Sequence, residues 1–151
     1  MKPMQAPVTG MEHAEADTPL GALSEFYRAF NNRDLDLMRR NWNQDECVLD
    51  NPLGGIRRGW AEIEPLYARL FNGPTKVYVV FFDYTLHIGD DLFCAAGRER
   101  GTFEKGETRI DLAIRTSRIY RRANGTWRQI HHHGSIDEPG LLQRYQAAVL
   151  G

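Results

Sequence analysis

The chain has 151 residues, of which 42% are hydrophobic, and its 19 Lys and Arg against 20 Asp and Glu give a formal net charge of −1. A chain of this length can form one globular domain whose core needs no disulfide or metal to fold. The balanced charge argues against a broad basic surface for nucleic acid or for an anionic membrane, and no apolar run is long enough to span a bilayer.

The ends and the cysteines set the expected boundaries and compartment. Cys47 and Cys94 are too few for a disulfide framework and fit a reducing compartment, so we expect a cytoplasmic protein. Residues 1–17 lack the apolar core of a secretion signal and predict a flexible leader. A single domain is expected over residues 18–151.

Three helices are predicted in the first half of the chain. Residues 18–31 place apolar side chains at helical spacing behind a threonine cap and a proline at the first helical position. Asp34 can cap a second, shorter helix. After the turn-forming residues 50–55, helical spacing resumes between Gly59 and Gly73.

Four strands and a last helix are predicted in the second half. Turn signals at residues 89–91, 105–106 and 124–125 divide the segment from Thr75 to Ser135 into strand-length pieces joined by hairpins. A short helix is expected after Pro139. The predicted fold class is therefore α+β, with three N-terminal helices packed on a curved antiparallel sheet and a short C-terminal helix.

The expected register brings polar residues to one face of the sheet. Two-residue loops at 105–106 and 124–125 would put Glu99 opposite Leu112 and Arg118 opposite His131. The other face is too rich in arginine to be a core, so we expect the first face to lie inside. Its polar members are Glu99, Thr116, Arg118, His131, His133 and Ser135.

Chemical roles follow from this arrangement. Glu99 and Arg118 would lie about 20 Å apart along the strands and should not pair. Arg118 would keep His131 neutral, so His131 and Glu99 are the candidate acid–base catalysts. Two histidines are too few for a metal site, and we expect neither a metal nor another cofactor. The predicted ligand-binding residues are Arg118, His133, Ser135, Asn51, Thr116, Trp42 and Trp60, although large aromatic residues on helices, such as the two tryptophans, more often belong to the core.

These residues resemble the nuclear transport factor 2-like superfamily over about residues 20–137. The likeness is strongest to SnoaL-like proteins and to the association domain of calcium/calmodulin-dependent protein kinase II, which has an arginine in one strand and then Gly, Trp, His-x-His and Ser. The matching positions here are Arg118, Gly125, Trp127, His131, His133 and Ser135. The resemblance implies a cone-shaped fold with a pocket. Gly134 and Glu99 replace arginines of that domain, which argues against carboxylate capture by several arginines.

Ketosteroid isomerase resembles the chain in fold but not in its reacting groups. At the positions of its catalytic Asp, its oxyanion-hole Tyr and its oxyanion-hole Asp, this sequence has Asn51, Phe26 and Thr116. The leading hypothesis is therefore a homodimeric domain that binds a polar or carboxylated small molecule. The alternatives are a cofactor-independent isomerase, cyclase or dehydratase that uses His131 or Glu99 as its base, and an oligomer-forming association module.

Overall fold

The computed structural model describes all 151 residues and contains four helices beside a six-stranded sheet. The helices are α1 (Pro19–Asn31), α2 (Leu35–Asn41), α3 (Trp60–Asn72) and α4 (Pro139–Leu150). The strands are β1 (Val48–Asp50), β2 (Ile56–Arg58), β3 (Lys76–Ile88), β4 (Leu92–Lys105), β5 (Thr108–Ala123) and β6 (Thr126–Ser135). The predicted α+β class is confirmed.

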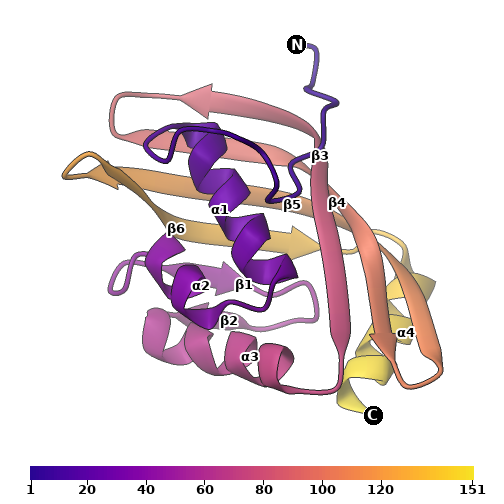
Figure 1. The fold of residues 1–151 in the computed structure, drawn as a ribbon. Helices are drawn as coiled ribbons and strands as arrows, with labels where there is room; N and C mark the ends of the chain where they lie inside the picture. The colour runs from indigo at the N-terminus through magenta and orange to yellow at the C-terminus, as the bar shows by residue number, and fades with distance from the viewer.

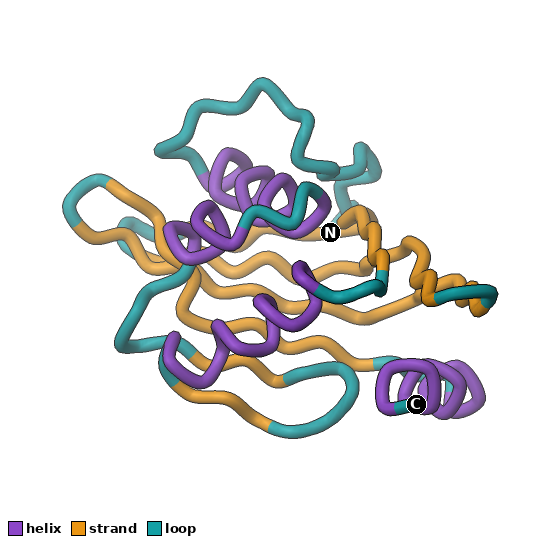
Figure 2. Tube along the Cα trace, turned by 60° about the horizontal axis from the view of Figure 1, so that its bottom comes forward, coloured by secondary structure: helices purple, strands orange, loops and turns teal.

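Helices α1, α2 and α3 lie on one face of a curved, unclosed sheet (Figure 1). Figure 2 shows α1, α2 and α3 on the same side of the strands, with α4 apart from them at the C-terminus. α4 packs where β4 turns into β5, since the Lys105 ammonium donates to the Ala148 carbonyl and the ring of Phe103 meets that of Tyr145. We call the helix-covered face inner and the opposite face outer.

The strand order is β2-β1-β6-β5-β4-β3, and one pair departs from the expected antiparallel arrangement. β1 runs parallel to β6, with Val48 opposite His131 and Asp50 opposite His133. No hairpin joins these two strands, so no turn forces them to be antiparallel. This pairing brings the turn after β1 to the same end of the sheet as the end of β6.

The two hairpin loops were predicted with different success. Asn124 and Gly125 form the β5–β6 turn with φ values of 53° and 76°, as expected for a tight hairpin. The β4–β5 turn is instead made by Gly106 and Glu107, one position later than predicted. This offset shifts the pairing by two residues and leaves every side chain on its predicted face.

A bulge in β6 overturns the predicted faces of its last residues. Gln129 pairs with Tyr120, but His131 pairs with Ile119, so Ile130 has no partner on β5. One extra residue exchanges the faces of everything that follows it. Beyond the bulge the inner residues are therefore even-numbered, beginning with His132.

The N-terminal segment is attached to the edge strand β3. Backbone hydrogen bonds attach Met4 to Tyr84 and Val8 to Phe81 of β3, and the Val8 side chain is buried. The flexibility of residues 1–17 stays a prediction.

None of the four helices has both the length and the apolar character needed to cross a membrane.

Candidate functional site

A cavity of about 390 Å³ lies between the inner face of the sheet, α1, α3, α4 and the turn after β1. Its walls are mostly apolar, and its size falls within the usual range of small-molecule pockets. The main aromatic and aliphatic contributors are Phe30, Leu66, Leu70, Val79, Phe103 and Tyr145. Four polar side chains from the sheet also line it: Glu99, Lys105, Arg118 and His132.

Glu99 and Arg118 form a buried ion pair at this cavity, contrary to the prediction that they lie far apart. Arg118 Nη2 donates to Glu99 Oε1 over 2.8 Å, and both side chains are almost fully buried. The turn offset places Glu99 opposite Ile114, which is about 13 Å along β5 from Arg118 at 3.3 Å per residue. Two long side chains directed toward each other across a concave face can close that separation.

The donors of Arg118 are directed to protein acceptors. Its Nε donates to the Tyr27 hydroxyl over 3.2 Å and its Nη1 to Gln129 Oε1 over 2.7 Å, in addition to the Glu99 bond. The guanidinium carbon also lies 3.6 Å from the centre of the Phe26 ring. Arg118 therefore has no free fork for a ligand carboxylate.

Glu99 keeps one oxygen available to the cavity. The Tyr27 hydroxyl donates to Oε1 over 2.6 Å, and the Arg118 bond goes to the same atom. No hydrogen bond from the protein reaches Oε2. The carboxylate can therefore accept a proton or a hydrogen bond from a bound molecule.

His132 is a polar residue of the cavity that the sequence prediction missed. It lies opposite Arg118 on the inner face with its ring at an angle of 63° to Phe26, and neither of its buried nitrogens has a hydrogen-bond partner. Burial first, and then the charge of Arg118, lower the pKa of His132 well below 6.5. A neutral imidazole with two unpaired nitrogens can accept a hydrogen bond at one and donate at the other.

Other predicted ligand-binding residues serve the fold. Asn51 lines the cavity, but its side-chain oxygen accepts from the backbone two residues later and so stabilises the turn. Trp42 and Trp60 are buried beside Tyr67 and do not line the cavity. Thr116 is buried on the inner face without reaching the cavity.

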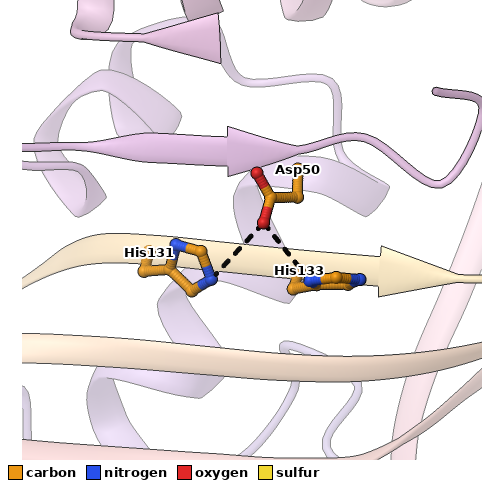
Figure 3. A group of neighbouring side chains, drawn as sticks. All are labelled: Asp50, His131 and His133. Atoms are coloured by element: carbon orange, nitrogen blue, oxygen red, sulfur yellow. Dashed lines mark ion pairs between the residues drawn. The ribbon is translucent and has the colours of Figure 1, made fainter. Parts of the chain in front are cut away.

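His131, His133 and Ser135 do not join Glu99 and Arg118, because the bulge places them on the outer face. They line an open depression of about 610 Å³ there. Asp50 lies next to the two histidines, with its Oδ2 atom 3.2 Å from His133 Nδ1 and 3.8 Å from His131 Nε2 (Figure 3). Two imidazoles and a carboxylate are a possible metal-ligand set, of which the sequence prediction placed only two members.

Comparisons with known proteins agree on the fold. A family model described as SnoaL-like domain matches residues 20–138. A provisionally assigned calcium/calmodulin-dependent protein kinase type II association domain from Thiobacillus denitrificans is 26% identical, with a TM-score of 0.62 over 78% of this chain and 94% of its own. A provisionally assigned NTF2-like dehydratase from Streptomyces avermitilis is 20% identical, with a TM-score of 0.67 over 76% and 89%.

The association domain of the Caenorhabditis elegans kinase is 23% identical to the chain, with a TM-score of 0.59 over 72% of this chain and 85% of its own. No curated protein matches the sequence significantly. The nuclear transport factor 2-like resemblance seen in the sequence is thereby confirmed at the level of the fold.

Proposed function

Because the chain belongs to the SnoaL-like domain family, we propose that it binds a small molecule in the inner cavity. The observation that carries the proposal is an apolar cavity of about 390 Å³ that contains one neutral histidine with unpaired nitrogens. Buried polar atoms without partners are costly, and a ligand that supplies a partner would recover that cost.

The expected ligand is mainly apolar and carries one neutral polar group, such as a hydroxyl or a carbonyl. The apolar walls favour a ring system or a branched chain, and His132 provides the recognition point. Of the polar or carboxylated ligands expected from the sequence, the carboxylated ones are disfavoured, because Arg118 is paired with Glu99 and a ligand carboxylate would add a second negative charge beside Glu99.

A catalytic form of this proposal uses the same residues. An isomerase, cyclase or dehydratase that needs no cofactor requires a base and an acid near one substrate carbon. His132 and Glu99 Oε2 are the available groups, so His132 takes the role that the sequence analysis gave to His131. Turnover should then fall in His132→Gln and in Glu99→Gln, while turnover should survive in His131→Gln.

The test compares 2-naphthol, naphthalene and 2-naphthoate as ligands in thermal-shift and calorimetric titrations. We expect 2-naphthol to bind best, because it alone combines the apolar ring with a neutral hydroxyl. His132→Leu should weaken its binding by up to about tenfold, as expected for one lost hydrogen bond. Leu66→Trp should abolish binding by filling the cavity.

Two control variants and two contrary outcomes belong to this test. His131→Leu on the outer face and Leu92→Trp outside the cavity should leave the affinity unchanged. Preferred binding of 2-naphthoate would overturn the assignment of a neutral polar group. If none of the three compounds nor a larger steroid-like ring stabilised the protein, the binding proposal itself would be contradicted.

A second candidate function is an association module. It is supported by the similarity to kinase association domains. Under this proposal the chain forms a ring larger than a dimer, and the cavity is secondary. Its free cysteines, Cys47 and Cys94, fit the reducing cytoplasm under either proposal.

A further inference from the structure

Asp50, His131 and His133 meet on the outer face because of two features of the sheet. The histidines are two residues apart on β6, so both side chains leave the same face of the strand. The bulge at Ile130 makes that face the outer one. β1 runs parallel to β6 and places Asp50 directly opposite His133, as Figure 3 shows.

The distances are close to those of a metal-binding triad. The three ligand atoms lie within 4.8 Å of one another, and Asp50 Oδ2 is 3.2 Å and 3.8 Å from the two imidazole nitrogens. In a tetrahedral site with metal–ligand bonds near 2.0 Å, neighbouring ligand atoms are about 3.3 Å apart. The contact between Asp50 and His133 already has this spacing, and a small movement of the partly exposed His131 ring would bring its nitrogen to it.

The geometry points to a binding site for a divalent transition metal, with Zn²⁺ as the expected occupant. Imidazole nitrogen suits zinc, copper, nickel and cobalt, whereas magnesium and calcium take oxygen ligands. Only three protein ligands are present and all are partly exposed, so at least one coordination position would remain open to water or another ligand.

The surroundings also suggest what that open position accepts. Arg115 lines the same depression, and its side chain forms neither an ion pair nor a hydrogen bond with the protein. A guanidinium beside a metal cation favours an anionic second ligand. This site is on the opposite face from the inner cavity and does not depend on the function proposed for that cavity.

Metal titration of the untagged protein, first treated with a chelator, tests the inference. We expect one equivalent of Zn²⁺ to bind by calorimetry and Co²⁺ to develop visible absorption bands of a low-coordinate site. Asp50→Asn and His133→Ala should each weaken binding by about tenfold or more, or about 1.4 kcal/mol.

Two histidine variants separate the triad from a general effect of surface imidazoles. His87→Ala removes an exposed histidine from β3, and His13→Ala removes an exposed histidine from the N-terminal segment. Both should keep the wild-type metal affinity. Unfolding temperatures in chelator identify any variant that is misfolded, and Zn²⁺ but not Mg²⁺ should raise the wild-type unfolding temperature. Absence of stoichiometric binding, or an Asp50→Asn variant with unchanged affinity, would overturn the assignment.

Discussion

The buried ion pair of Arg118 and Glu99 connects the sheet to α1, because Tyr27 of α1 contacts both side chains. Tyr27 of α1 donates to Glu99, and Gln129 of β6 accepts from Arg118. A buried pair of this kind contributes little relative to an apolar pair, but the loss of one partner leaves an uncompensated charge in the core. The network therefore connects Tyr27 of α1 to side chains of β4, β5 and β6.

Replacement of Arg118 should destabilise the protein, because it removes one partner of the buried ion pair. Arg118→Met leaves the Glu99 carboxylate buried without a cation, so we expect the free energy of unfolding to fall by about 3–5 kcal/mol. Denaturant unfolding at pH 7 measures the loss. The double variant with Glu99→Met should recover most of it. If the double variant were as unstable as Arg118→Met alone, the loss would come from the packing of Arg118 against Phe26 and not from the unpaired carboxylate.

His132 should make stability depend on pH in a definite direction. Its pKa in the folded protein lies well below the value near 6.5 of the unfolded chain, so protons bind preferentially to the unfolded state. The stabilisation is complete above pH 6.5 and is lost as the pH falls below it, by at most about 1.4 kcal/mol per pH unit.

Comparison of wild-type protein with His132→Leu at pH 7 and pH 5 isolates this contribution. The variant should lose less free energy of unfolding between these pH values than the wild type does. His87→Ala should keep the wild-type dependence. Equal pH dependence in wild type and His132→Leu would mean that His132 titrates normally in the folded protein.

At the level of elements, β6 shows what turn signals can and cannot specify. The Asn124–Gly125 turn sets the register correctly as far as Gln129. Register is propagated by regular alternation, so a bulge further along the strand escapes any argument based on loop length. A signal was present: Trp127 of β6 and Ile136, the residue directly after the strand, are both large and apolar but nine residues apart. Unbroken alternation through Ile136 would put them on opposite faces, and both are buried.

The cap of α4 offers a second test at this scale. The carboxylate of Glu138 accepts from the backbone of Gly140 and Leu141, whereas the neighbouring Asp137 makes no such bond. Glu138→Ala should destabilise α4 by about 1 kcal/mol. Hydrogen exchange in residues 142–150 should then accelerate without a change in β5. Asp137→Ala should leave exchange unaltered, and equal effects of the two variants would contradict the assigned cap.

For the whole molecule, periodicity was sufficient to predict the class and the order of helices and long strands. It could not predict the parallel pairing of β1 with β6. β1 has only three residues, too few to show alternation, and no turn joins it to β6. The residues of the site were predicted less well than the fold, because a pocket depends on which side chain faces inward at single positions. Glu99 and Arg118 were correctly placed inside, while His132 and the aromatic walls were not identified.

The two faces of the sheet also bear on assembly. The outer face carries no helices, and the sequence predicts a homodimer. Light scattering of the purified protein should therefore give a mass of about 35 kDa, twice the 17.3 kDa of the chain. A much larger ring would favour the association-module proposal. A monomer at micromolar concentration would contradict both the predicted homodimer and the association module.

The unpaired Ile130 has a consequence for comparing this chain with its relatives. In a homologue whose last strand is regular, the residue facing the equivalent of Arg118 would align, without a gap, with His131. In this chain that residue is His132. A gapless alignment with such a homologue would therefore match structural positions up to Gln129 and be wrong by one position beyond it. His131 would share the alignment column, whereas His132 would share the place in the cavity.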